Sequence, residues 1–444
     1  MSRTAARQRA VEGRKREYRQ FGMFETSVQR SREKAILVGL EHDGVDRWEL
    51  KESLEELAEL ASSAGAEVVG TVTQKLEQPT APFYIGKGKA EHVAQQCQKE
   101  QVTSVIFDDE LSPAQGRNLE KLTERKVLDR TQLILDIFAQ RARSREGRLQ
   151  IELAQLQYLL PRLTGMWTHL SRQSGGIGTR GPGETQLEVD RRRVQERIAK
   201  LERDLTDVRK HRSIQREGRR RHHWPVAALV GYTNAGKSTL LNKLTGAEVL
   251  AADQLFATLD PTTRQLMLPN NQKVLLTDTV GFIRKLPHTV IESFKATLEE
   301  VHEADLLIHI VDLSHPNFQE QIQAVHTVVR ELDADGKQML TVFNKIDAVT
   351  NPELVAAQIR RTPNSVAISA KTGAGLPEML EELEGQLAAW RLRASYRFPA
   401  AESALIAEIH RVGHVLEIRY EEEEVIIRAH VPPHLGVRIA KYEG

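Results

Sequence analysis

Residues 231–238 have the composition and spacing of a phosphate-binding loop. They match GxxxxGK[ST] and lie between an apolar run at 225–230 and a helix-forming run at 239–244. In this strand–loop–helix context, backbone N–H groups surround the phosphates of a nucleotide. We expect the Lys237 ammonium to lie between the β- and γ-phosphates and the Ser238 hydroxyl to bind Mg²⁺. The expected loop residues are Gly231, Tyr232, Thr233, Asn234, Ala235, Gly236, Lys237 and Ser238.

Two further segments carry groups suited to a γ-phosphate and its metal ion. An apolar run at 274–277 ends in Asp278, Thr279, Val280 and Gly281. Asp278 would hold Mg²⁺ through water, and the Gly281 N–H would meet the γ-phosphate. Residues 256–264, which we call the switch segment, begin with Phe256, Ala257, Thr258, Leu259 and Asp260. We expect Thr258 to ligate Mg²⁺ when the γ-phosphate is present, with Thr262 and Thr263 as less favoured alternatives.

The base is predicted to be guanine. Asn344, Lys345, Ile346 and Asp347 follow an apolar run at 340–343, and Ser369, Ala370 and Lys371 follow a run at 366–369. The Asp347 carboxylate can accept hydrogen bonds from both N1–H and the exocyclic amine of guanine, a pair that adenine lacks. The backbone at 369–371 would meet the base oxygen, and the Lys371 stem would cover the site. Each segment follows a predicted strand, and ligands bind at the carboxyl ends of parallel strands.

Two α/β domains are expected to carry these segments and a partner surface. Residues 225–393 form the nucleotide-binding domain. Residues 31–130 alternate between predicted strands at 35–40, 67–72, 104–108 and 127–128 and predicted helices at 49–62, 90–100 and 112–125. This alternation predicts a largely parallel sheet covered by helices.

Residues 131–224 predict a helical hairpin followed by a basic linker at 211–224. Leucines at 149, 153, 156, 160 and 163 repeat at heptad spacing, and a second series runs from 187 to 208. Each helix would have one narrow apolar stripe, so the two would pair antiparallel with the glycine-rich residues 175–186 at the tip. An arm at 141–168 would be ~40 Å long. The alternative is a pair of core helices in a bundle, joined by a flexible loop.

The two ends of the chain are less informative. Residues 1–30 read as a solvated basic tail. Residues 394–444 predict a small α+β or β-rich domain, with strands at 415–420 and 425–431 and a loop at Pro432, Pro433 and Gly436.

Positive charge is concentrated in one part of a nearly neutral chain. The 444 residues carry a formal net charge of +1, yet residues 141–221 contain 20 basic and 10 acidic residues. Such asymmetry predicts contact with an anionic polymer there. The single cysteine, Cys97, cannot form an intramolecular disulfide, and no apolar run approaches the ~18 residues of a membrane span. We expect a cytoplasmic protein without a membrane span, and a monomer.

These motifs resemble those of HflX-type GTPases. The resemblance rests on GYTNAGKS, FATLDPTTR, DTVGF, NKID and SAK, on GGIGTRGPGETQLEVDRRR before them, and on FYIGKGKAEHV and IFDDELSPAQGRNLE near the N-terminus. It implies a GTPase that binds the large ribosomal subunit in its GTP form and separates stalled or idle ribosomes. It also implies that the N-terminal region, with the hairpin, contacts ribosomal RNA. Competing interpretations are a GTPase that assists RNA modification or remodelling, and a signalling switch with a protein partner.

Three positions keep alternative interpretations. Phe282 stands where many GTPases have a glutamine that orients the attacking water, so intrinsic turnover would be slow and ribosome-stimulated; packing alone is the alternative. Asn234 matches the position that coordinates K⁺ in potassium-dependent relatives, or it stabilises the loop. Residues 86–89 form a turn with exposed lysines, an RNA contact or a second nucleotide site. The expected catalytic residues are Lys237, Thr258, Gly281 and Phe282, and the expected metal ligands are Ser238, Thr258 and, through water, Asp278.

Overall fold

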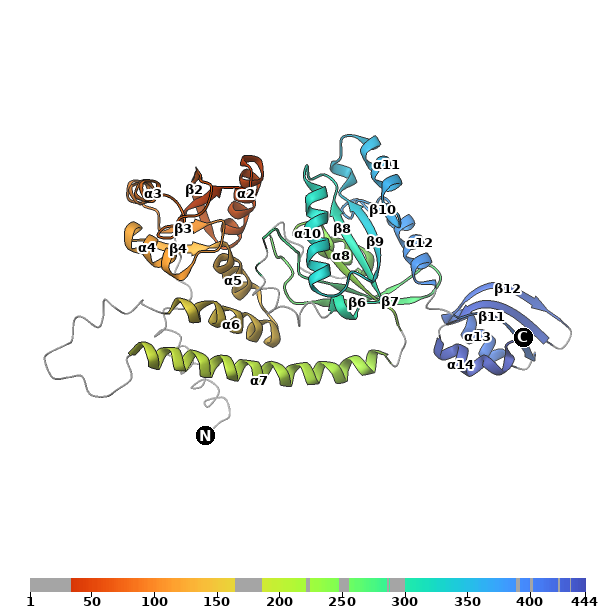
Figure 1. Ribbon diagram of the computed structural model, residues 1–444. Helices are drawn as coiled ribbons and strands as arrows, with labels where there is room; N and C mark the ends of the chain where they lie inside the picture. The colour runs from red at the N-terminus through yellow and green to blue at the C-terminus, as the bar shows by residue number, and fades with distance from the viewer. Residues whose placement is uncertain are drawn as a thin grey trace.

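The computed structural model has two α/β units, a pair of packed helices and a small C-terminal unit (Figure 1). It describes residues 33–163, 186–220, 224–246, 255–285, 287, 300–388, 392–399, 402–421, 424–431 and 433–444. The basic tail and the glycine-rich tip of the predicted hairpin lie outside these residues. Among the described helices, none combines the length and the apolar composition that crossing a membrane requires.

The N-terminal unit is built on a parallel four-stranded sheet with the order β2-β1-β3-β4. Alternate side chains of the central strand β1 pack on opposite faces, against α2 and α5 on one side and α3 and α4 on the other. The predicted strands and helices of this unit are confirmed. Its elements are β1 (Glu33–Glu41), α2 (Arg47–Ser63), β2 (Ala66–Lys75), α3 (Lys87–Lys99), β3 (Ser104–Phe107), α4 (Pro113–Thr123) and β4 (Lys126–Asp129).

The helical pair consists of α6 (Arg145–Leu159), continued by a 3₁₀ turn (Leu160–Arg162), and α7 (Gln186–Arg220), and α5 (Arg130–Arg141) precedes it. The two leucine series pack against each other, with Leu201 fully buried at the contact. The prediction of one continuous arm from residue 141 is wrong, because Ala142 is extended and Ser144 starts α6 as its N-cap. Residues 164–168 of that arm lie outside the described part of the chain.

Two other expectations for this region need correction. Residues 211–220 belong to α7 and are not a linker, since their arginine, glutamine and glutamate residues all favour helices. Helix α6 also has two buried faces rather than one narrow stripe. Ile151, Ala154 and Tyr158 pack toward α5 and the nucleotide-binding unit, while Leu153 and Leu156 pack on α7. The helical pair is therefore attached to both α/β units.

The nucleotide-binding unit has a six-stranded sheet with the order β10-β9-β8-β5-β7-β6, in which only β6 is antiparallel to its neighbour. The predicted α/β fold class is confirmed. The strands are β5 (Val226–Gly231), β6 (Thr262–Met267), β7 (Lys273–Asp278), β8 (Leu306–Asp312), β9 (Gln338–Asn344) and β10 (Ser365–Ala367). The helices include α8 (Lys237–Thr245), α10 (Phe318–Glu331), α11 (Pro352–Arg361) and α12 (Leu376–Gln386).

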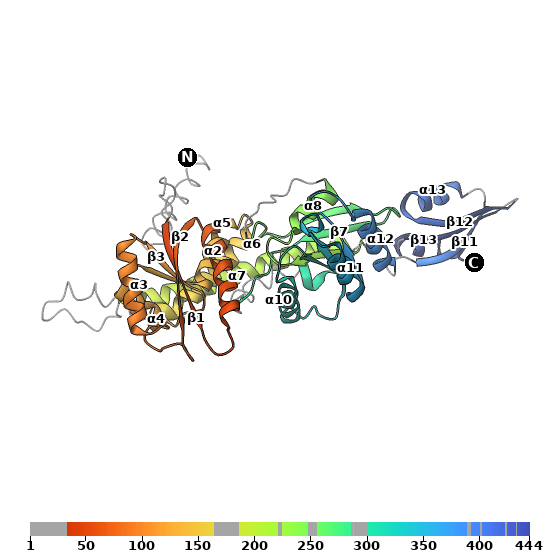
Figure 2. The ribbon, with the colours of Figure 1, turned by 90° about the horizontal axis from the view of Figure 1, so that it is seen from above.

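The C-terminal unit lies at the opposite end of the molecule from the N-terminal unit (Figure 2). Its three-stranded antiparallel sheet has the order β11-β13-β12. Strands β12 (His414–Tyr420) and β13 (Glu424–Val431) are confirmed, and β11 (Leu392–Pro399) and α13 (Ser403–Val412) were not predicted. The loop predicted around Pro433 is wrong: α14 (Pro433–Ile439) begins there, because proline is favoured in the first turn of a helix.

Candidate nucleotide-binding site

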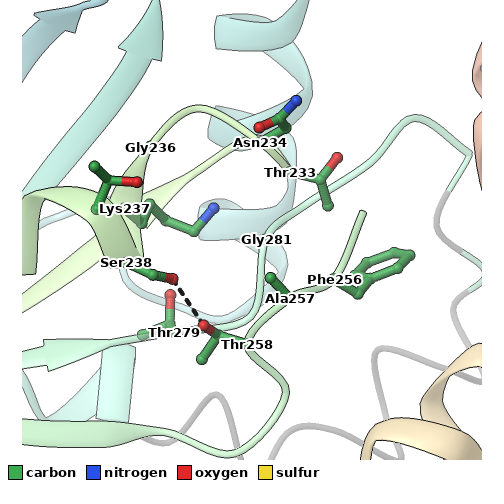
Figure 3. A pocket seen from close by; sticks show the side chains of 11 residues that line it. Thr233, Asn234, Gly236, Lys237, Ser238, Phe256, Ala257, Thr258, Thr279 and Gly281 are labelled. Atoms are coloured by element: carbon green, nitrogen blue, oxygen red, sulfur yellow. Dashed lines mark hydrogen bonds between the residues drawn. The ribbon is translucent and has the colours of Figure 1, made fainter. Parts of the chain in front are cut away.

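The phosphate loop connects β5 to α8 and surrounds a pocket (Figure 3). Two of its glycines are required by space. A Cβ on Gly231 would lie 2.3 Å from the Ile310 carbonyl oxygen, and one on Gly236 would lie 2.3 Å from Nδ2 of Asn344; both have positive φ. The pocket is lined by Thr233, Asn234, Gly236, Lys237, Ser238, Thr239, Phe256, Ala257, Thr258, Thr279 and Gly281.

Lys237 supplies positive charge to the floor of the pocket. Its side chain is 6% exposed, and Nζ donates to the carbonyl oxygens of Tyr232 (2.7 Å) and Gly231 (3.1 Å). Burial lowers the pKa of Lys237 to about 8. A Cβ on Gly281 would lie 2.8 Å from Cα of Thr233 and 3.0 Å from this Nζ, so only glycine fits opposite the loop. An anion entering here would meet the ammonium and the loop N–H groups together.

Three oxygen-bearing side chains meet beside the loop. Ser238 and Thr258 each donate to Oδ2 of Asp278, at 2.7 and 2.8 Å. Their own hydroxyl oxygens are 2.8 Å apart (Figure 3). Asp278 is fully buried, burial raises its pKa, and its Oδ1 has no hydrogen-bond partner in the described structure. A hard divalent cation such as Mg²⁺ prefers oxygen donors of this kind, so these residues fit the expected ion.

The two alternative threonines lie elsewhere. Thr262 and Thr263 belong to β6, and the Thr263 hydroxyl is 3.0 Å from that of Thr277 on β7. The structure therefore brings Thr258 to Ser238 and Asp278, the other expected metal ligands, and places Thr262 and Thr263 in the sheet.

Asn344 joins the phosphate loop to the segment expected to bind the base. Its Nδ2 donates to the Ala235 carbonyl oxygen (2.8 Å), and its Oδ1 accepts from the Ala370 N–H (2.9 Å). Asp347 is exposed, and its Oδ1 accepts from the Ser369 hydroxyl at 2.6 Å. Asn344 thus links the phosphate loop to the segment at 369–371. The Asp347 carboxylate lies at the surface, where the edge of a guanine base can reach it.

Lys345 and Asp312 form a pair that the sequence analysis missed. Lys345 Nζ lies 2.7 Å from Oδ2 of Asp312, which ends β8. The sequence did contain a signal for Asp312, because this residue ends a strand in the same way as Asp278 and Asn344 do.

The remaining predicted site residues do not line the pocket; they are Gly231, Tyr232, Ala235, Leu259, Asp260, Asp278, Val280, Phe282, Asn344, Lys345, Ile346, Asp347, Ser369, Ala370 and Lys371. The Phe282 ring is 1% exposed and belongs to the apolar core shared with the N-terminal unit, which favours the packing interpretation. Asn234 has a left-handed φ of 59°, which asparagine tolerates well, so its conformation agrees with the loop-stabilising alternative. Its K⁺ role stays a prediction.

Buried charges join the nucleotide-binding unit to the N-terminal unit. Arg130, 2% exposed, pairs with Glu56 and with Asp108, and Lys285 also reaches Asp108 at 2.7 Å. The Tyr232 hydroxyl, within the phosphate loop, donates to Glu56. Sequence reasoning could not pair these residues, because each partner is remote along the chain.

A phosphate loop after β5, an acidic residue after β7 and a guanine-directed carboxylate after β9 are the features of the P-loop GTPase class. Family models agree with this class over most of the chain. One described as "GTP-binding GTPase N-terminal" matches residues 51–139, one described as "GTP-binding GTPase Middle Region" matches 141–219, and one described as "50S ribosome-binding GTPase" matches 226–345.

The chain is also similar to curated relatives over nearly its whole length. GTPase HflX of Lacrimispora saccharolytica is 49% identical over 92% of this chain and 96% of its own. GTPase HflX of Escherichia coli is 46% identical over 88% of this chain and 92% of its own. The chain belongs to the HflX family of GTPases. It binds GTP and hydrolyses it to GDP and phosphate.

Proposed function

We propose that the protein binds the large ribosomal subunit in its GTP form and splits stalled or idle ribosomes. The observation that carries this proposal is the packing of α6 between a basic helix and the nucleotide site. One face of α6 packs on α7, and the other shares a core with Phe256 and Leu259 of the switch segment. A change at the nucleotide therefore has a short physical route to the helical pair.

The charge of the helical pair suits an RNA partner. Arg191, Arg192 and Arg193 are exposed in succession near the start of α7, and Lys200 and Arg203 follow on the exposed surface. Exposed cations that neutralise backbone phosphates dominate affinity for nucleic acids and make it salt-dependent. The description of the matching family model, a 50S ribosome-binding GTPase, supports the ribosome as the source of that RNA.

Each residue of the pocket has a distinct role in the proposed cycle. Lys237 and the loop N–H groups would bind the phosphates, and Ser238, Thr258 and Asp278 would hold Mg²⁺, which when bound neutralises charge on the β- and γ-phosphates. Asp347 would select guanine. The Phe282 ring is buried in the core and has no hydrogen-bonding group with which to orient water, so the ribosome would supply or order that element and intrinsic turnover would be slow.

Splitting is tested by light scattering of intact ribosomes mixed with the full-length protein. We expect the scattering to fall with a non-hydrolysable GTP analogue and to stay constant with GDP. The matched control is Lys237→Ala, which lacks the phosphate-binding ammonium and should leave scattering unchanged with either nucleotide. Constant scattering with wild-type protein and the analogue would contradict the splitting activity. If this protein instead remodels RNA independently of the ribosome, free structured RNA would stimulate its GTP hydrolysis as strongly as ribosomes do.

A further inference from the structure

The switch segment is held on both sides of Thr258 by helices outside the GTPase sheet. Before Thr258, the Phe256 ring packs edge-on against Phe138 of α5, with ring centroids 4.6 Å apart and an interplanar angle of 80°. After Thr258, the Asp260 carboxylate reaches the start of α6. Thr258 itself contacts Ser238 and Asp278. It therefore lies between the two residues that contact α5 and α6 and is held next to the expected metal ligands.

The Asp260 carboxylate completes the cap of α6. Its Oδ2 accepts from the backbone N–H groups of Arg143 (2.9 Å) and Ser144 (2.7 Å), and its Oδ1 accepts from the Ser144 hydroxyl. Ser144 is the N-cap of α6, and its Oγ accepts from the Gly147 N–H at 2.9 Å. A carboxylate at a helix N-terminus is stabilised by charge-assisted hydrogen bonds and by the helix dipole.

A glycine in the first turn of α6 leaves space for this carboxylate. A Cβ on Gly147 would lie 2.7 Å from Oδ1 of Asp260 and 3.0 Å from Oγ of Ser144. Alanine favours a helix over glycine, so helix propensity alone does not explain the glycine. The position is instead explained by the contact with the switch segment.

We propose that the N-terminus of α6 is the receptor for the switch segment and that Asp260 is a positioning residue for Thr258. Asp260 is two residues from Thr258, so its contact with α6 holds the Thr258 hydroxyl close to Ser238 and Asp278. By linkage, whatever strengthens the Asp260–α6 contact strengthens binding of GTP relative to GDP, and bound GTP in turn fixes the orientation of α6. This inference rests on the proposed function only for its consequence at the ribosome, since the contact itself is within the chain.

The test compares nucleotide affinities of full-length variants without ribosomes. Fluorescent GDP and a fluorescent non-hydrolysable GTP analogue are titrated with Mg²⁺ and with EDTA. We expect Asp260→Ala and Gly147→Ala to weaken Mg²⁺-dependent binding of the analogue about tenfold, the size of effect expected for lost charge-assisted hydrogen bonds, and to change GDP binding less than twofold.

Gly116→Ala is the matched control, because Gly116 lies in the first turn of α4 and a Cβ there would meet nothing within 4 Å. It should change neither affinity. If Asp260→Ala fails to fold, Gly147→Ala retains the test, since alanine favours the helix and GDP binding reports the folded state. Equal weakening of GDP and the analogue, or no weakening of either, would overturn the inference.

Hydrogen exchange provides a second readout. We expect the amides of Arg143 and Ser144 to exchange more slowly with the GTP analogue than with GDP in the wild type, and equally fast with both in Asp260→Ala. Variants that bind both nucleotides normally but lose the ribosome would overturn this inference and leave the proposed function standing.

Discussion

Asp347 is the exposed side chain that we expect to determine which nucleotide base is bound. Asp347 follows β9, and its carboxylate accepts a hydrogen bond from the Ser369 hydroxyl. We expect Asp347→Asn to weaken GTP and GDP binding by about a hundredfold or more, because the amide offers a donor where guanine also presents donors. Calorimetric titration measures the loss. Asp335→Asn, an exposed aspartate before β9, is the control, and an equal effect of both substitutions would remove Asp347 from base recognition.

His309 predicts a specific pH dependence of stability. It lies within β8, is 1% exposed, and its Nδ1 has no hydrogen-bond partner in the described structure. Burial, with smaller effects of His326 and Lys237, lowers the pKa of His309 to about 3. The unfolded chain binds a proton near pH 6.5 that the native state does not, so stability is present above that pH and is lost as the pH falls toward 3.

We therefore expect His309→Leu to lose less stability than the wild type between pH 7 and pH 5. The difference is up to about 1.4 kcal/mol for each pH unit below 6.5. Denaturant unfolding at the two pH values measures it, and His410→Leu, an exposed histidine on α13, is the control. If the wild type and His309→Leu lost stability equally, His309 would not be the titrating group.

Local motifs made part of the nucleotide site predictable, because Lys237, Ser238 and Asp278 each sit at a fixed offset from a strand end. The Asp260 contact was not predictable in the same way. Its partner Ser144 lies 116 residues earlier and belongs to a different unit, and nothing in the spacing of either segment indicates the other.

At the scale of elements, α5 begins at the junction of the two α/β units. Burial alone would raise the pKa of Asp108, but Arg130 and Lys285 together hold it below its usual range. Removing a partner from such a buried pair leaves an uncompensated charge. We expect Arg130→Met to lower the free energy of unfolding by about 3–5 kcal/mol, because Asp108 and Glu56 lose their shared partner.

Chemical denaturation tests this expectation, with Arg360→Met on the exposed face of α11 as the control. A loss no larger than that of the control would mean that the buried pairs of Arg130 do not stabilise the fold.

Element types were more predictable than their ends. Heptad spacing correctly paired the leucines of α6 with the apolar positions of α7, because a seam on one helix requires a complementary seam. The break at Ala142 is accompanied by the local N-cap of Ser144 and by the tertiary contact of Ser144 with Asp260 of the switch segment, and spacing does not reveal the second of these. The second buried face of α6 was missed although Ile151, Ala154 and Tyr158 have the same three- and four-residue spacing as the leucines, because alanine and tyrosine indicate a buried face less strongly than leucine does.

At the scale of the whole molecule, the neutral total charge conceals a division between units. Exposed arginines gather on α7, while the pocket lies in the adjoining α/β unit and connects to α7 through α6. The order of the units along the chain could be inferred from their composition. Their packing could not, because it depends on contacts between segments remote along the chain, such as Lys285 with Asp108 and Tyr232 with Glu56.

Sedimentation of the full-length protein with purified large ribosomal subunits directly tests GTP-dependent binding to the ribosome. We predict that the protein sediments with the subunit in the presence of a non-hydrolysable GTP analogue, that GDP weakens this binding at least tenfold, and that rising salt weakens it further. Equal binding with both nucleotides, or none with the analogue, would contradict the proposed function.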